Sequence, residues 1–275
     1  MPAYLPRIVA MRAPLPMGLA RHGALHRLLH DMPHQMPSRL LILATRNAHK
    51  VREIRAVLGG HLRYHGLNDF PDAPTTIEDA ATFAGNATKK ALELARWLAR
   101  SENSQLATRN SKLHVLADDS GLEVDALNGA PGVHSARFAA LNGSGGSSPE
   151  GPGSDADNNA KLLRLLETVP WERRTARFRC VLALTPVLPL ARNGSSPVCY
   201  ADELELQIEL FEGSCEGQIG FAAHGQGGFG YDPLFIPAGC QQSFAELGAD
   251  IKNRLSHRAR ALAKLRERWA KYPVS

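Results

Sequence analysis

The chain has 275 residues, 44% of them hydrophobic, which is enough to bury a full core in one large domain or in two lobes. No apolar run approaches the roughly 20 residues of a membrane span, and the four cysteines show neither C-x-x-C pairs nor zinc-finger spacing, so we expect reduced thiols in a cytoplasmic protein. The formal net charge of +5 is concentrated at the two ends, and without a nucleic-acid-binding motif it favours a small anionic ligand over a stable nucleic-acid partner.

Residues 1–37 differ from the rest of the chain in composition. They are rich in Met, Pro, Arg and His, and their only acid is Asp31. Four histidines recur at every fourth position, at His22, His26, His30 and His34. This spacing would align them on one helix face as metal ligands, but a glycine and a proline interrupt it. We therefore expect a disordered N-terminal extension; an organelle transit peptide and an over-extended start before Met36 are the alternatives.

The first folded unit is a strand, a turn and a helix. Leu40–Ala44 predicts a buried strand, residues 45–47 a turn, and Ala48–Leu58 a helix with Asn47 as its N-cap. Lys50 lies in the first turn of that helix, where free amides and a cation together suit an anion. The unit lacks the glycines of a Walker A loop, so a solvated Lys50 stays the alternative.

A second strand and a long helix follow. Leu62–His65 predicts the strand, and Thr82–Arg100 predicts the helix because its apolar positions fit a period of 3.6 residues. Glu78 lies just before this helix. It is either a capping acid or a metal ligand.

The stretch after the next strand carries the densest chemistry. Leu113–Ala117 predicts a strand that delivers two adjacent carboxylates, Asp118 and Asp119, which point to opposite faces. Glycines and a proline from Gly121 to Gly132 are expected to bend the chain as a cleft-lining loop does. Buried carboxylates need a cation or hydrogen bonds. A capped strand end is the alternative.

The middle of the chain predicts two expanded loops among regular elements. Gly143–Asp157 is expected to be a flexible Gly/Ser-rich insertion in the domain predicted for residues 38–275, and Asn158–Glu167 predicts an amphipathic helix. Thr175–Thr185 predicts a central strand, Val187–Pro197 a loop, and Tyr200–Phe211 a half-exposed antiparallel strand.

Two ligand-binding candidates lie near the C-terminus. The glycine-rich segment Gly225–Pro237 can approach a ligand closely, and its Phe229 offers a flat face for a base. Ser256 would cap a basic helix that extends to Tyr272, and the cations at its start suit phosphate or a purine carbonyl. The alternatives are a tight hairpin with core aromatics and a solvated basic helix.

Six motifs occur in one order along the chain. They are Thr45-Arg46-Asn47-Ala48-His49-Lys50, Ala117-Asp118-Asp119-Ser120-Gly121-Leu122-Glu123-Val124-Asp125, Gly129-Ala130-Pro131-Gly132, Ser135-Ala136-Arg137, Gly228-Phe229-Gly230-Tyr231-Asp232-Pro233 and Ser256-His257-Arg258. Over about Arg39 to Trp269 the chain resembles the non-canonical purine nucleoside triphosphate pyrophosphatases, also called inosine/xanthosine triphosphatases.

The resemblance implies an α/β fold: an elongated, long mixed β-sheet with two lobes, flanking helices and an active-site cleft between the lobes. It implies a homodimer that hydrolyses XTP, ITP and dITP to the monophosphate and pyrophosphate with Mg²⁺, which cleanses the nucleotide pool. A nucleotide-binding protein without turnover and a basic nucleic-acid-binding module are the competing hypotheses.

The resemblance also implies residue roles. Asp119 would accept the proton of the attacking water and contact magnesium, with Glu78 as the second metal ligand. The implied substrate-binding residues are Thr45, Arg46, Asn47, Ala48, His49, Lys50, Ser120, Phe229, Gly230, Tyr231, Asp232, Lys252, His257 and Arg258. One departure from the family pattern is Gly85, which precedes Asn86. Family members often carry an acidic residue at this position, and we expect the absence of that acid to weaken magnesium binding.

Overall fold

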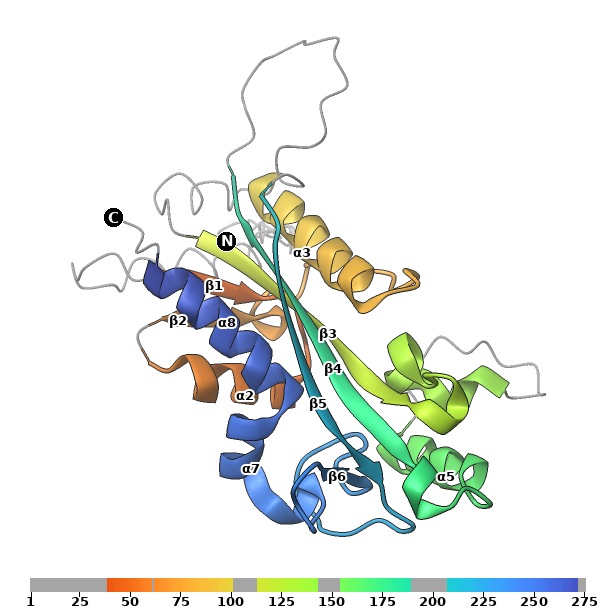
Figure 1. The fold of residues 1–275 in the computed structure, drawn as a ribbon. Helices are drawn as coiled ribbons and strands as arrows, with labels where there is room; N and C mark the ends of the chain where they lie inside the picture. The colour runs from red at the N-terminus through yellow and green to blue at the C-terminus, as the bar shows by residue number, and fades with distance from the viewer. Residues whose placement is uncertain (1–38, 61, 101–112, 143–153, 189–206, 272–275) are drawn as a thin grey trace, which may run out of the picture. The chain divides into compact units, whose positions relative to one another are not determined.

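In the part of the chain that the structure describes, a mixed sheet of six strands organises the fold (Figure 1). The computed structural model describes residues 39–60, 62–100, 113–142, 154–188 and 207–271. These residues belong to one unit, Pro37–Ser275. The other unit, Met1–Met36, lies outside the described residues, so the disordered extension stays a prediction.

The strand order is β2-β1-β3-β4-β5-β6. The strands are β1 Leu40–Leu43, β2 Arg63–Gly66, β3 Leu113–Val124, β4 Thr175–Pro186, β5 Glu209–Ile219 and β6 Phe235–Pro237. β2, β1 and β3 are parallel, whereas β3 to β6 pair antiparallel. The expected mixed sheet is confirmed.

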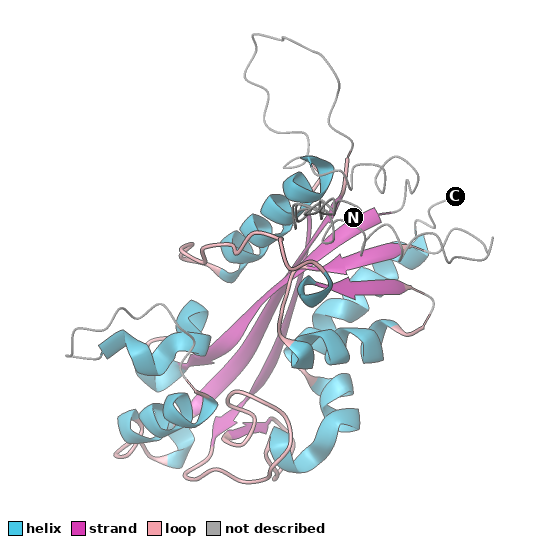
Figure 2. Ribbon diagram, turned by 180° about the vertical axis from the view of Figure 1, so that it is seen from behind, coloured by secondary structure: helices cyan, strands magenta, loops and turns pink. Residues whose placement is uncertain are grey.

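Helices cover both faces of the sheet, as Figure 2 shows from behind. The α-helices are α2 Ala48–Leu58, α3 Phe83–Arg100, α5 Asp155–Leu165, α7 Phe244–Leu255 and α8 His257–Lys271; the 3-10 helices are η1 Leu67–Asp69, η2 Asp125–Leu127, η3 Gly132–Asn142 and η4 Trp171–Arg173. Gly121 and Gly213 lie on opposite faces, and a Cβ at each would meet α3 and α8 respectively. Among the described helices, none is long and apolar enough to cross a bilayer.

Two apolar clusters lie along the face that α8 covers. One joins Leu116, Leu182 and Phe211 to side chains of α2 and α8. The other joins Leu122 and Phe178 to Phe235, Phe244 and the side chains of α5. On β3, the polar residues 118–120 lie between Leu116, which belongs to the first cluster, and Leu122, which belongs to the second.

The structure corrects two expected boundaries in the middle of the chain. β3 continues through the carboxylate pair to Val124, so Gly121 does not bend the chain. Gly121 is needed for another reason: a Cβ there would collide with Ser135 and lie 2.5 Å from the carbonyl oxygen of Gly132. α5 begins at Asp155, with Ser154 as its N-cap, three residues earlier than expected.

The other corrections concern the C-terminal half. β5 spans Glu209–Ile219 and so extends beyond the expected end at Phe211, because glycines in its second half interrupt the strand pattern; residues 200–206 of the expected strand lie outside the described residues. α7 was not expected; Gly248, at φ 80°, interrupts its periodicity. Residues 143–153 and 189–206 lie outside the described residues, and so do most of the two expected loops.

Candidate active site

Asp118 and Asp119 lie at the point of the sheet where the connecting helices change from one face to the other. β1 is followed by α2 and β3 is preceded by α3, and these helices approach the sheet from opposite faces. In parallel α/β sheets, ligands bind at the carboxyl ends of strands at such a switch point. Pairing of β1 with β3 ends at Leu43 and Leu116, and β3 continues beyond it. The edge of β3 at residues 118–120 is therefore free of β1.

The turn after β1 forms the predicted N-cap. Asn47 Oδ1 accepts hydrogen bonds from the amides of His49 (2.9 Å) and Lys50 (3.2 Å). Thr45 Oγ1 accepts one from the amide of Asn47 at 3.1 Å. The amides of Asn47, His49 and Lys50 are therefore already hydrogen-bonded within the turn.

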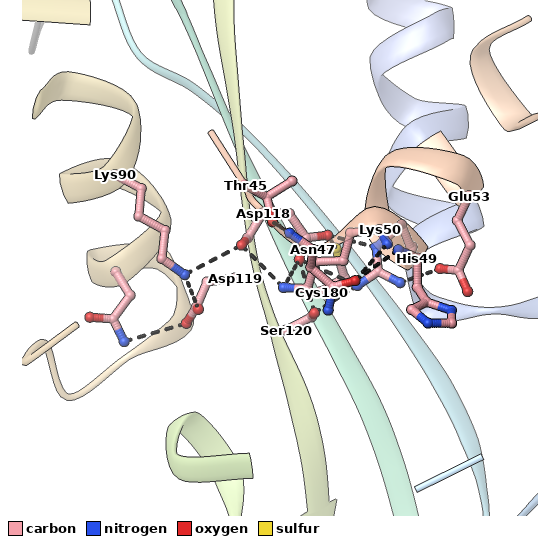
Figure 3. A network of polar contacts seen from close by, with 12 residues as sticks. Thr45, Asn47, His49, Lys50, Glu53, Lys90, Asp118, Asp119, Ser120 and Cys180 are labelled. Carbon is pink, nitrogen blue, oxygen red and sulfur yellow. Dashed lines mark hydrogen bonds and ion pairs between the residues drawn. The ribbon is translucent and has the colours of Figure 1, made fainter. Parts of the chain in front are cut away.

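Asp118 forms the centre of a buried ion-pair network (Figure 3). Its carboxylate lies 2.5 Å from Lys50 Nζ and 2.7 Å from Arg258 Nε, and Ser120 Oγ donates to it at 2.9 Å. Burial raises the pKa of this carboxyl, but the charges of Arg258 and Lys50 outweigh that effect and hold the pKa well below its usual range. Asp118 is therefore ionised at neutral pH.

Glu53 extends this network toward the glycine-rich loop. It pairs with Arg258 and, at 2.8 Å, with Lys252, whose Nζ also lies 2.5 Å from Asp232 Oδ2. Burial raises the pKa of Glu53, but Arg258 and Lys252 lower it further than burial raises it. Sequence reasoning missed Glu53; its position three residues after Lys50 on a helix was the available signal.

Asp119 faces the opposite side of the sheet, toward α3 (Figure 3). Lys90 Nζ lies 2.8 Å from Asp119 Oδ1 and 2.9 Å from Glu78 Oε2. Asn86 Nδ2 donates to Asp119 Oδ2 at 3.4 Å. The two expected metal ligands therefore converge on one ammonium group. Asn86 and Lys90 were not expected, although their i, i+4 spacing places them on one helix face.

The two carboxyls of this second cluster titrate differently. Burial raises the pKa of Asp119, and Lys90 and Lys50 only partly offset it. Burial also raises the pKa of the more exposed Glu78, but there Lys90 outweighs it and the pKa is lowered. Asp119 is the carboxyl of the pair that holds a proton more readily.

The donor set fits a hard divalent cation. Over the residues that the structure describes, no group of three or more His, Cys, Asp or Glu side chains gathers to hold a metal. Two converging carboxylates suit Mg²⁺, which binds one or two carboxylates and takes its other ligands from water and phosphates. A Cβ at Gly85 would lie 2.8 Å from that of Ala80, so an acid there requires the Glu78 loop to shift.

The glycine-rich loop reaches the same region through Phe229. The Phe229 ring lies 5.1 Å from the His49 ring, and Lys252 Nζ lies 4.3 Å from its centroid. Tyr231 is buried and donates to Ser135 O at 2.9 Å, and Asp232 Oδ2 accepts from the Phe229 amide at 2.8 Å. Phe229 and Asp232 are thus the members of this motif that contact the ion-pair network, both through Lys252.

His257 is a neutral, buried imidazole. Its ring stacks on Phe178 with centroids 4.8 Å apart, and its Nδ1 has no hydrogen-bond partner among the described residues. Burial and the nearby cations Arg258 and Lys252 hold its pKa well below the usual range. It can therefore donate or accept one hydrogen bond without carrying charge.

Two expected residues point elsewhere. The Arg46 guanidinium donates to Ala73 O at 3.0 Å and ties the turn after β1 to the loop after η1, and the Tyr231 hydroxyl donates to Ser135 O. The expected residues that share the ion-pair network are Lys50, Ser120, Phe229, Asp232, Lys252 and Arg258.

The chain is similar to a named group of enzymes. Residues 41–268 match the model of the Ham1 family. A dITP/XTP pyrophosphatase of Geobacillus kaustophilus is 43% identical over 231 residues, which cover 83% of this chain and 93% of that protein. A protein of the same name from Desulforamulus reducens is 45% identical over 229 residues, 82% of this chain and 94% of its own length.

Solved structures agree with this similarity. A HAM1 protein from Coxiella burnetii superposes with a TM-score of 0.62 at 32% identity and covers 85% of this chain and 99% of its own. The Ham1 protein of Staphylococcus aureus has a TM-score of 0.61 at 28% identity, with the same coverage. The expected α/β fold is confirmed.

Proposed function

The chain belongs to the Ham1 family, and on that basis we propose that it hydrolyses dITP, ITP and XTP to the monophosphate and pyrophosphate. Relatives that share more than two fifths of their residues with it are named dITP/XTP pyrophosphatases. The proposal rests on one observation: Asp119 and Glu78 both pair with the Lys90 ammonium group. Lys50 pairs with Asp118, the residue next to Asp119.

Magnesium is the metal that we propose for this site. Asp119 and Glu78 would hold it, because both offer hard carboxylate oxygens and both face the same ammonium group. When bound there, it supplies positive charge beside the phosphates. The resemblance of the motifs further leads us to propose a homodimer in the cytoplasm.

Asp119 is proposed as the base that takes the proton of the attacking water. Its burial raises its pKa toward the working pH, which favours proton uptake, and Lys90 holds one carboxylate oxygen in place. Asp118 is unsuited to this role because Arg258 and Lys50 lower its pKa and so make it a weak proton acceptor. Its proposed role is to orient those two cations.

Lys50 and Lys252 are proposed to neutralise the triphosphate. Each is paired with a carboxylate in the free protein, so a phosphate would replace or share that partner. Phe229 would stack on the purine, and the His257–Arg258 end of α8 would recognise its 6-keto oxygen. A donor there rejects adenine, whose 6-amino group would leave it unpaired.

The direct test is product analysis with ITP and Mg²⁺. We expect pyrophosphate, with no orthophosphate, and a loss of about 10² to 10⁴ in kcat for Asp119→Asn because a positioned base is removed. Asp125→Asn is the matched control, since Asp125 pairs with Arg177 near the end of the same strand. ITP binding without product would indicate a silent nucleotide-binding protein.

Substrate preference needs a second comparison. XTP, ITP and dITP should be hydrolysed faster than ATP under the same conditions. Salt-sensitive binding to DNA or RNA, without pyrophosphate release, would instead support the nucleic-acid hypothesis.

A further inference from the structure

The glycine-rich loop is held firmly on one side of Phe229. Tyr231 is anchored through its hydroxyl to Ser135, and Asp232 accepts the amide of Phe229. A Cβ at Gly228 would collide with the Asp232 carboxylate, so the chain can make this close turn only as glycine. These contacts come from the loop itself and from η3.

A second restraint comes from α5, which no motif assigns to the site. The Gly230 amide donates to Asp155 Oδ2 at 2.6 Å, and Asn159 Nδ2 donates to Gly230 O at 3.0 Å. Asp155 and Asn159 are four residues apart, on one face of the first helical turns. One helix face therefore holds both polar backbone groups of the residue that follows Phe229.

The Asn159 contact lowers the stability of the fold, because it leaves a polar atom unpaired that an apolar side chain would not have. Its amide nitrogen must face Gly230 O, since the reversed amide would set two acceptors against each other. Its Oδ1 is then buried and lacks a hydrogen-bond partner in the described part of the chain. A leucine would fill similar space without an unpaired polar atom. The loop contact explains the asparagine better than core packing does.

We propose that Asp155 and Asn159 are positioning residues that fix Gly230 and so hold the Phe229 ring in place for the purine. This inference rests on the proposed function. Neither side chain needs to touch the substrate. Both act on the base half of the nucleotide, while Lys50 and Asp119 act on the phosphate half.

The test uses the full-length protein and two variants, Asn159→Leu and Asp155→Ala, each of which removes one side-chain hydrogen bond to Gly230. Each should raise the KM for ITP about fivefold, the effect of one net hydrogen bond, and leave kcat within twofold. Calorimetry should show weaker binding of inosine monophosphate by a similar factor. Inhibition by pyrophosphate should not change. The melting temperature of Asn159→Leu should equal or exceed that of the wild type.

Asp157→Ala is the matched control, because Asp157 lies in the same helical turn and its carboxylate accepts from Ser154 Oγ instead. It should leave the KM unchanged. Unchanged KM and inosine monophosphate affinity in both variants, with an active wild type, would overturn this inference alone. A fall in kcat and melting temperature together would also overturn it, since that pattern marks a structural role. Wild-type protein that releases no pyrophosphate would instead refute the proposed function.

Discussion

Two adjacent aspartates have opposite electrostatic environments in this protein. Asp118 and Asp119 point to opposite faces of β3, as strand geometry requires. Asp118 meets Arg258 and Lys50, which lower its pKa, whereas burial raises the pKa of Asp119 despite Lys90. Neighbours in sequence can therefore serve as a fixed counter-ion and as a proton acceptor.

Asp118→Asn should strongly destabilise the fold. It leaves Arg258, which is almost fully buried, without one of its two carboxylate partners, and breaking a buried pair typically costs about 3–5 kcal/mol. Urea unfolding at pH 7 measures the difference.

The same substitution predicts a pH dependence. Because the folded pKa of Asp118 lies well below its unfolded value of about 3.9, its contribution is fully present above that value. It is lost as the pH falls through the folded pKa. The wild type and Asp118→Asn should thus converge in strong acid, and equal stabilities at pH 7 would contradict the role of Asp118.

The dependence of stability on pH that we expect from Asp119 has the opposite sign. Its folded pKa is raised, so folding favours the protonated form, and that stabilisation is lost as the pH rises through the folded pKa. At pH 7 to 8, Asp119→Asn should therefore be at least as stable as the wild type without metal. Mg²⁺ at ten times its dissociation constant should stabilise the wild type by about 1.4 kcal/mol. EDTA should reverse this, and an equal gain in Asp119→Asn would exclude Asp119 as a ligand.

At the scale of elements, β5 and α8 pack almost backbone to backbone. A Cβ at Gly213 of β5 would collide with His257 O and lie 2.6 Å from Ala261 N. The start of α8 carries Arg258, so this close approach sets the distance between the ion-pair network and the sheet. Gly213, which interrupts the strand pattern of β5 in the sequence, is also the residue that permits this contact.

Gly213→Ala should therefore push α8 away from the sheet. We expect a loss of about 1–3 kcal/mol, as for other overpacked sites, and a fall in kcat/KM for ITP because Arg258 moves. Gly60→Ala is the control: no heavy atom lies within 4 Å of its added Cβ, and such changes are neutral or slightly stabilising. Equal unfolding free energies for the two variants would rule out tight packing at Gly213.

Elements with a strong local signal were predicted within a residue or two. α2 and α8 begin where Asn47 and Ser256 cap them, and α3 begins at Phe83. β5 and α7 were missed or misplaced because glycines at 213, 217 and 248 break their periodicity. Close packing requires glycine at 213 and 217, and a positive φ favours it at 248, so the local pattern fails where the fold needs a glycine inside an element.

At the scale of the whole molecule, every described site residue belongs to the unit Pro37–Ser275, and the family match spans 41–268. Deleting residues 1–36 should therefore leave kcat and KM for ITP within twofold of the full-length values. Steady-state kinetics of both proteins checks this. A large loss of activity with an intact fold would assign the first unit a role in the reaction.

The sequence by itself determined the family, the fold class, the capped helices and the residues of the six motifs, because these depend on short-range spacing and residue type. Only the tertiary structure decided which side chains pair with one another in the site. Lys50 and Arg258 meet Asp118 from 68 and 140 residues away, and Glu53, Lys90, Asn86 and Asn159 joined the site without a motif of their own. Charges that distant are brought together by the crossing of helices over the sheet, and local sequence does not encode which face each helix will cover.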